Sequence, residues 1–292
     1  MSARSLLFVP GDSDRKLERC GASGADLVIL DLEDSVAPEH KAAARERVGA
    51  WLAARPAGAR MQCWVRINPL DSVESGRDLA AVAAARPDGI VQPKVRSAED
   101  VVGLGRVLEE LELRHGIGTG AIRILPIATE LPEAVFALGG YARCGARLYG
   151  LTWGAEDLSA AVGASANRDA HGNWTAPYQL ARSLCLFGAR AAGVAAIDTL
   201  HADFRDDSGL RASCAEARRD GFTGKLAIHP QQVGVINECF MPSAAEVAEA
   251  RRIVALFAAN PGVAALALDG RMVDLPHLRL AQGTLARAGA TP

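Results

Sequence analysis

The sequence predicts a parallel α/β barrel of the TIM (β/α)8 type, followed by a helical extension at the C-terminus. Eight short apolar runs recur along most of the 292-residue chain, each followed by a segment of helical character. They span about 230 residues, close to the roughly 250 typical of this fold. A polar or charged group follows nearly every run, as expected where functional residues gather at one end of a barrel. An open, doubly wound sheet is the structural alternative.

The apolar runs are mostly continuous rather than alternating, which is typical of parallel strands covered on both faces. We expect strands over residues 5–9, 27–31, 62–67, 89–92, 122–127, 148–152, 194–197 and 225–228. The segments between them carry helical spacing of apolar residues, or proline near a start and glycine at an end. We expect helices over residues 12–20, 38–54, 98–113, 132–140, 178–192 and 209–220.

The C-terminal part departs from this alternation of strand and helix. Residues 246–258 have the pattern of an amphipathic helix, and a final helix is expected over about residues 278–288. We therefore divide the chain into a barrel domain, residues 1–235, and a C-terminal extension, residues 236–292.

Composition excludes several classes of protein. The chain is 49% hydrophobic and 23% charged, and 32 Lys and Arg oppose 34 Asp and Glu for a net charge of −2. No basic excess indicates nucleic acid or a membrane surface as a partner. No apolar run reaches the roughly 20 residues that span a bilayer. The six cysteines lack any C-x-x-C spacing, which favours free thiols in a cytoplasmic protein.

Two carboxylates follow neighbouring strands in the middle of the chain. Glu130 comes shortly after the strand over 122–127, and Asp157 shortly after the strand over 148–152. In a parallel sheet both would emerge at the same rim. Mg2+, or Mn2+ in its place, takes one or two protein carboxylates and fills its other positions with water and substrate. The pattern therefore predicts a divalent-cation site, whereas either acid alone would more often be a first-turn helix residue.

Six sequence blocks, in order along the chain, resemble the HpcH/HpaI aldolase–citrate lyase superfamily, in particular its citrate lyase β-subunit-like branch. The blocks are Arg4-Ser-Leu-Leu-Phe-Val-Pro-Gly-Asp, Asp31-Leu-Glu-Asp-Ser-Val-Ala-Pro-Glu-His-Lys, Val65-Arg-Ile-Asn-Pro, Gln92-Pro-Lys, Gly154-Ala-Glu-Asp-Leu and Gly224-Lys-Leu-Ala-Ile-His-Pro. The resemblance implies a TIM barrel that binds Mg2+ and makes or breaks a carbon–carbon bond beside an acyl thioester. It also implies an extension that packs on a neighbouring subunit, in trimers or hexamers.

The resemblance assigns the central roles in catalysis. It makes Glu130 and Asp157 the Mg2+ ligands, with Glu130 also touching substrate, and it places Arg66 against the thioester carbonyl or the oxo acid. Asp274 would be the acid–base group, reaching the site of an adjacent chain. Two plainer alternatives stay open. Arg66 could be a structural partner of Glu33, and Asp274 could begin a helix before Leu-Pro.

Supporting roles follow from position. Backbone N–H groups of Gly154 and Ala155, at a helix start, are expected to bind the substrate carboxylate. Asp31 and Glu33 are expected near the metal, where they would orient its waters and the arginine. The residues expected to meet CoA phosphates, on weaker grounds, are Arg15 and Lys16.

These assignments predict an Mg2+-dependent lyase acting on a 3-hydroxyacyl-CoA such as citramalyl-, malyl- or citryl-CoA. The products would be acetyl-CoA, or a homologue, and a short 2-oxo acid. Three alternatives stay open: a malyl-CoA-type thioesterase or malate-synthase-like enzyme, an aldolase of free hydroxy-oxo acids, and a citrate lyase subunit that needs an acyl carrier protein. The carrier protein is the less favoured partner, and a homotrimer or hexamer is expected.

Overall fold

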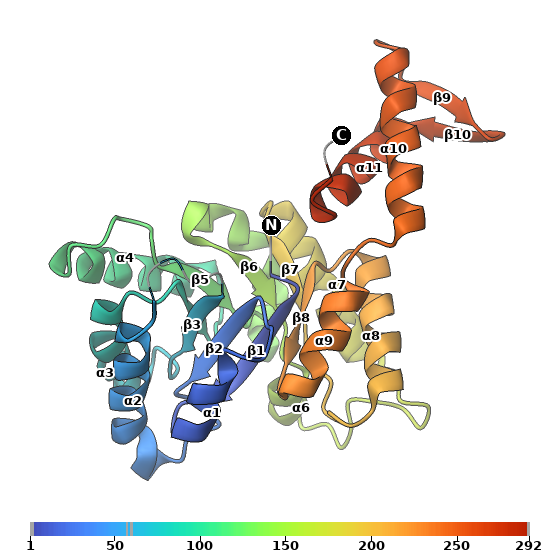
Figure 1. Cartoon of the computed structure of the whole chain (residues 1–292). Helices are drawn as coiled ribbons and strands as arrows, with labels where there is room; N and C mark the ends of the chain where they lie inside the picture. Colours follow the sequence, from blue (N-terminus) through green and yellow to red (C-terminus); the bar gives the residue numbers. More distant parts are fainter. Residues whose placement is uncertain (1–2, 57, 59–60, 291–292) are drawn as a thin grey trace. The chain divides into compact units, whose positions relative to one another are not determined.

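Eight parallel strands form one ring in the computed structural model, which describes residues 3–56, 58 and 61–290 (Figure 1). The strands are β1 (Ser5–Pro10), β2 (Leu27–Asp31), β3 (Gln62–Arg66), β4 (Gly89–Gln92), β5 (Arg123–Pro126), β6 (Gly150–Thr152), β7 (Ala195–Asp198) and β8 (Gly224–Ala227). Their order is β5-β4-β3-β2-β1-β8-β7-β6, and every pairing in this sheet is parallel. Each predicted strand is present, with bounds that differ by a few residues.

The two edge strands of this order meet and close the ring. Isolated parallel bridges join Ile124 to Leu148 and Ile127 to Thr152. Backbone hydrogen bonds accompany them, with Tyr149 N donating to Ile124 O at 2.8 Å. The sheet is therefore a (β/α)8 barrel and not the open, doubly wound alternative.

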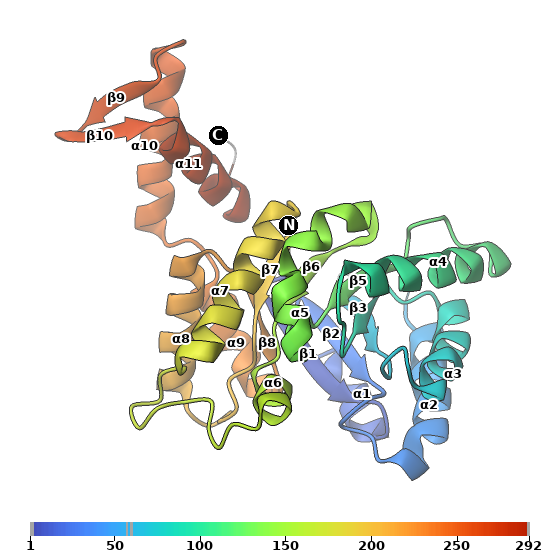
Figure 2. The same cartoon turned by 180° about the vertical axis from the view of Figure 1, so that it is seen from behind.

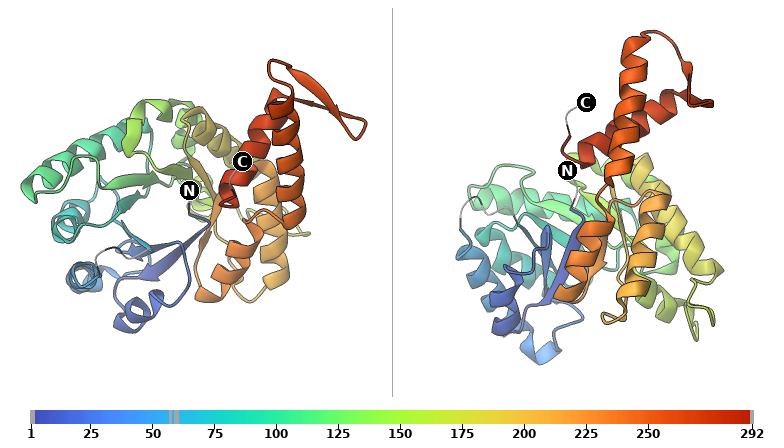
Figure 3. Two further views of the ribbon diagram at one scale, coloured as in Figure 1. Left: turned by 45° about the horizontal axis from the view of Figure 1, so that its top comes forward. Right: turned by 45° about the vertical axis from the view of Figure 1, so that its right-hand side comes forward.

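Helices surround the ring, as Figure 2 shows from behind and the left view of Figure 3 shows with the top of the molecule tilted forward. They are α1 (Asp14–Cys20), α2 (Lys41–Ala53), α3 (Val73–Val82), α4 (Ala98–Arg114), α5 (Pro132–Ala137), α6 (Ala155–Val162), α7 (Ala176–Ala191), α8 (Asp207–Asp220) and α9 (Pro230–Cys239). The helix predicted over 132–140 differs most. It leaves α geometry after Ala137 and continues as 3-10 turns over Leu138–Arg147, which are interrupted by a kink at Gly145. This stretch contains three glycines, which weaken an α-helix.

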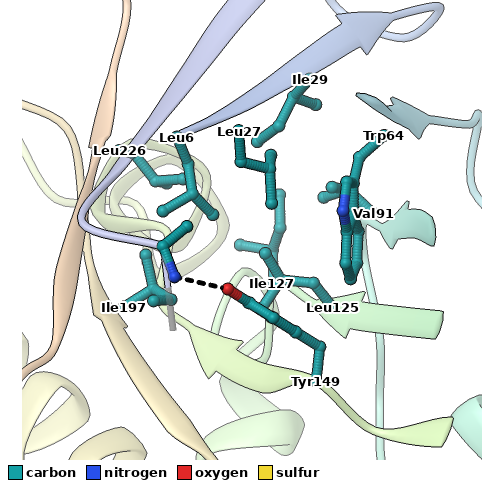
Figure 4. Close-up of a cluster of buried hydrophobic side chains, with 11 residues drawn as sticks. Leu6, Leu27, Ile29, Trp64, Val91, Leu125, Ile127, Tyr149, Ile197 and Leu226 are labelled. Atoms are coloured by element: carbon teal, nitrogen blue, oxygen red, sulfur yellow. Dashed lines mark hydrogen bonds between the residues drawn. The ribbon is translucent and has the colours of Figure 1, made fainter. Parts of the chain in front are cut away.

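Large apolar side chains fill the inside of the barrel (Figure 4). Trp64 and Tyr149 pack edge to face with ring centroids 4.9 Å apart, and the Tyr149 hydroxyl accepts a hydrogen bond from Ala3 N at 2.7 Å. Gly89 makes room for this pair, because a Cβ there would lie 2.5 Å from the Trp64 ring. The interior is thus a packed core, which leaves the strand ends to carry polar groups.

A buried polar network lies between β6, β7 and β8. Lys225 and Asp198 are 1% and 2% exposed, and the Lys225 ammonium donates to Asp198 Oδ2 at 2.6 Å. The indole N–H of Trp153 donates to Asp198 Oδ1 at 2.8 Å, and Arg182 lies 3.4 Å from the same oxygen. Burial alone would raise the pKa of Asp198, but the Lys225 and Arg182 charges lower it. The network fixes Trp153 just beyond the end of β6.

The chain divides into two compact units after Asn237. The second contains α10 (Ala244–Ala259), a hairpin of β9 (Ala265–Leu268) and β10 (Arg271–Asp274), and α11 (Leu275–Arg287). Buried Ala250, Ala281 and Leu285 form its own small core. Its assignment as an oligomerisation segment stays a prediction. Among the described helices, none combines the length and apolar character needed to cross a membrane.

Candidate active site

Arg66, at the carboxyl end of β3, is held by two acids from β2 and the loop after it. Asp31 and Arg66 are partners in the β2–β3 register. The guanidinium donates from Nε and Nη2 to the two Asp31 oxygens, both at 2.7 Å, and Nη1 lies 2.8 Å from Glu33 Oε2. Burial alone would raise the pKa of Asp31, but its bonds to Arg66 lower it. Two of the five N–H groups of Arg66 donate hydrogen bonds to Asp31, and Nη1 contacts Glu33 without good hydrogen-bond geometry, so N–H groups remain to bind a substrate.

Glu130 and Asp157, the two predicted metal ligands, converge on a single cation. The Lys94 ammonium donates to Asp157 Oδ1 at 2.6 Å and lies 3.5 Å from Glu130 Oε1. Glu130 is 2% exposed, and its other oxygen accepts a hydrogen bond from the backbone N–H of Lys94 at 2.5 Å. The same ammonium lies 3.2 Å from Glu33 Oε1. Carboxylates that follow three different strands, those of Glu33, Glu130 and Asp157, therefore surround the same ammonium group.

The carboxylates around Lys94 are not fully neutralised by the nearby positive charges. Burial raises the pKa of Glu130 to about 8, with repulsion from Asp157 adding to it and the Lys94 ammonium opposing it. Burial likewise raises the pKa of Glu33 to about 7. Neither Glu33 oxygen receives a hydrogen bond of good geometry, although Arg66 and Lys94 lie within 3.2 Å. A divalent cation would supply the missing charge.

The donor set fits Mg2+. In the parts of the chain that the structure describes, no group of three or more His, Cys, Asp or Glu side chains is arranged to hold a metal ion. Mg2+ does not require such a group, because it binds through one or two carboxylates and keeps several waters. Glu130 and Asp157 offer hard oxygen ligands of that number. They are the residues that would hold the ion.

A cavity of about 230 Å3 opens beside the acids. Its wall carries Arg66, Glu130 and Asp157, which are thereby brought to one space. The rest of the wall is largely apolar and aromatic, contributed by Phe8, Ile127, Trp153, Leu200, Leu226 and Ile228. A wall that carries both charged groups and an apolar surface suits a small organic acid joined to a longer, less polar group.

The helix start at α6 also lines the cavity, through Gly154 and Ala155. Gly154 is required sterically, because a Cβ there would lie 2.8 Å from Glu130 Cγ. Its N–H is already engaged, since it donates to Thr129 Oγ1 at 3.1 Å. Of the two predicted carboxylate-binding groups, the Ala155 N–H is therefore the better placed to bind a ligand.

The two predicted CoA contacts do not line this cavity, and Asp274 belongs to the second unit. Arg15 and Lys16 are exposed on α1 and are not part of the cavity wall. Asp274, in the second unit, is the N-cap of α11, where Oδ1 accepts from His277 N and lies 2.5 Å from His277 Nδ1. These contacts with His277 lower the pKa of Asp274. Within one chain Asp274 is a helix cap, and its role in a neighbouring site stays a prediction.

Two site residues had no role in the sequence prediction. Lys94 enters the sequence analysis only as the last residue of the Gln92-Pro-Lys block, and its positive φ of 50° is not visible in the sequence. Trp153 immediately precedes the block that begins at Gly154, and its indole N–H donates a hydrogen bond to Asp198. For both residues the available signal was their position at the carboxyl end of a strand.

A closed parallel barrel with an acid-rich cavity at the carboxyl ends of its strands defines an α/β-barrel enzyme. Within that class, the chain belongs to the HpcH/HpaI aldolase/citrate lyase family, whose profile matches residues 4–230.

Relatives in this family are similar along nearly the whole chain. A (3S)-malyl-CoA thioesterase of Cereibacter sphaeroides is 35% identical, over 98% of this chain and 95% of its own. The mitochondrial citramalyl-CoA lyase of Rattus norvegicus is 32% identical, over 98% of this chain and 86% of its own. The structure of CitE from Mycobacterium tuberculosis with magnesium, acetoacetate and coenzyme A matches with a TM-score of 0.79 and 33% identity, over 99% and 98% of the two chains. The family and its named lyases identify the chain as a carbon–carbon lyase by class.

Proposed function

We propose that the protein is an Mg2+-dependent lyase that cleaves, or forms, a 3-hydroxyacyl-CoA, with acetyl-CoA or a homologue and a short 2-oxo acid as products. The observation that carries this proposal is the convergence of Glu130 and Asp157 on one cation position, beside Arg66 and within one cavity. The magnesium and coenzyme A bound to the CitE structure support the same cofactor and substrate class. Cleavage of CoA thioesters by purified protein, with and without Mg2+, is the direct test.

The reaction removes the proton of the 3-hydroxyl group and breaks the C2–C3 bond, which leaves an oxo acid and a thioester enolate that is protonated at its α-carbon. Bound Mg2+ would supply a Lewis acid for the oxo-acid oxygens. The N–H groups of Arg66 that do not donate to Asp31 would donate to the oxygen on which the enolate charge develops. Asp31 and Glu33 hold that guanidinium in place. Ala155 N–H would bind the carboxylate, and Asp274 of an adjacent chain would transfer the α-carbon proton.

The cavity favours an oxo acid with one carboxylate. Among the described residues that line it, Arg66 is the only cation, and Phe8, Ile127 and Leu226 face the same space. A second carboxylate would lose its hydration without a partner there. We expect kcat/KM for condensation of acetyl-CoA with pyruvate or glyoxylate to exceed that with oxaloacetate by about 10²-fold, a ratio typical where a buried polar group lacks its partner. Equal or faster condensation with oxaloacetate would contradict the proposal that the apolar wall of the cavity selects an oxo acid with one carboxylate.

Thioester hydrolysis is the second candidate, and the similarity to the (3S)-malyl-CoA thioesterase favours it. Both reactions would use the same cation site and thioester, but they release different products. Free thiol without an oxo acid would identify the hydrolase, and an oxo acid with the thioester intact would identify the lyase. A carrier-protein thioester is a further alternative, tested by repeating the assay with an acylated carrier.

A site shared between chains can be tested by mixing two inactive variants. Asp274→Asn keeps a good N-cap for α11 and removes the carboxylate, whereas Glu130→Gln removes a proposed metal ligand. Asp274→Asn alone is expected to lose about 10²–10⁴-fold in kcat, the range of general acid–base catalysis, and Glu130→Gln alone on the order of 10³-fold through the loss of a metal ligand. After subunit exchange, mixed oligomers should contain intact sites and recover at least tenfold over either variant. Exchange demonstrated by mass spectrometry without any recovery would refute the sharing of Asp274 between chains.

A further inference from the structure

Lys94 occupies the place at which the proposed metal ligands meet. Its ammonium has four carboxylate oxygens within 3.5 Å, from Asp157, Glu33, Glu130 and Asp34. The shortest contact, 2.6 Å, is to Asp157 Oδ1, and the contact with Glu130 is through Oε1. An ammonium in this position neutralises the same two carboxylates that a divalent cation would use.

We infer that Lys94 is an internal cation that competes with the divalent metal for Glu130 and Asp157, and that its withdrawal from them accompanies metal binding. This inference rests on the proposed function, because it takes the metal site to be real. Two positive groups cannot both lie against this pair of carboxylates without repulsion, and the burial of Glu130, which is 2% exposed, increases that repulsion by lowering the local dielectric. The lysine therefore lowers metal affinity and stabilises the metal-free protein.

The backbone and the side chain of Lys94 have separate attachments. The backbone N–H donates to Glu130 Oε2 at 2.5 Å, and φ is 50°, in the left-handed region that is uncommon for residues other than glycine. The side chain is 24% exposed, and a flexible four-carbon stem connects its ammonium to the backbone. The residue can therefore stay anchored to Glu130 while its ammonium moves.

A second position for the ammonium is available at the solvent edge. Asp34 Oδ2 lies 3.5 Å from Lys94 Nζ, and the Asp34 side chain is 58% exposed, compared with 2% for Glu130. Moving toward Asp34 keeps one carboxylate partner and vacates the inner oxygens. Hydration of a lysine at that edge lowers the cost of the move. Asp34 thus gives the displaced charge a partner outside the metal position.

The test measures metal affinity and not turnover. Lys94→Met removes the charge and keeps an apolar stem, and Lys94→Gln provides a second uncharged variant should the first fail to fold. Binding of Mn2+, followed by the loss of its free paramagnetic resonance signal, and of Mg2+, by calorimetry, is expected to be at least tenfold tighter in both variants. The metal-free variants should also melt below the wild type, with a larger rise in melting temperature when Mg2+ is added.

Lys41→Met is the matched control, because it removes the same charge from the first residue of α2. The Lys41 ammonium donates to the carbonyl oxygens of Leu32 and Glu33 rather than to the proposed ligands. Its metal affinity should stay close to that of the wild type. Wild-type binding with unchanged or weaker binding by the Lys94 variants would overturn the inference alone. No binding by the wild type or by either Lys94 variant would overturn the metal site itself, and the inference with it.

Discussion

Glu130→Gln is expected to lower kcat by on the order of 10³-fold, because it removes a charged ligand whose cation stabilises the transition state by several kcal/mol. The substitution keeps the size of the side chain and an oxygen that can accept the hydrogen bond from Lys94 N. Since burial already raises the pKa of Glu130 to about 8, a neutral amide should leave the metal-free fold intact. Steady-state rates across an Mg2+ titration, together with thermal melting, measure both effects.

Glu133→Gln is the control for this variant. Glu133 lies in the first turn of α5, and its side chain is 59% exposed. It should retain nearly full activity and an unchanged Mg2+ dependence. If Glu130→Gln kept its activity, or if the wild type were unaffected by EDTA, the assignment of Glu130 as a metal ligand would be wrong.

Arg66→Lys is expected to lower kcat by about 10²–10³-fold with little change in KM, as when one donor to a developing oxyanion is lost. A lysine keeps the charge, but it cannot pair with both Asp31 oxygens, contact Glu33 and still present a fixed pair of N–H groups. Retaining the charge avoids leaving Asp31, which is 1% exposed, without any cation.

Arg77→Lys on α3 serves as the comparison, since Arg77 pairs with Glu74 at the surface and is 64% exposed. Its kcat should match that of the wild type. If Arg66→Lys raised KM and preserved kcat, Arg66 would contribute uniform substrate binding. That result would argue against a role at the enolate oxygen.

Local pattern was sufficient to predict the barrel. Continuous apolar runs mark each strand, because a strand covered by helices buries consecutive residues, and this signal survives without any tertiary information. The pairing of Glu130 with Asp157 followed from the parallel rule that places both strand ends at one rim. Arg66 and Asp31 also lie at strand ends, and their contact follows from the β2–β3 register.

Features that depend on long-range contacts could not be predicted from the sequence. Lys94 lies 63 residues before Asp157 in the chain. Its role depends on its positive φ and on four acidic side chains that surround its ammonium. The start of the final helix is instead a local feature: it was expected at about residue 278, but the alternative in which Asp274 begins a helix is correct, because Asp274 and His277 form a capping box and the helix begins at Leu275. The hairpin of β9 and β10 went unrecognised, because its strands are too short to give a clear alternation.

The most direct test of the proposed function is a cleavage assay of the purified protein with malyl-CoA, citramalyl-CoA and citryl-CoA in turn, following oxo acid and free thiol separately, with and without Mg2+. We predict Mg2+-dependent release of an oxo acid while CoA stays acylated, fastest with malyl-CoA or citramalyl-CoA. Release of free thiol without an oxo acid, or cleavage that persists in EDTA, would contradict an Mg2+-dependent lyase.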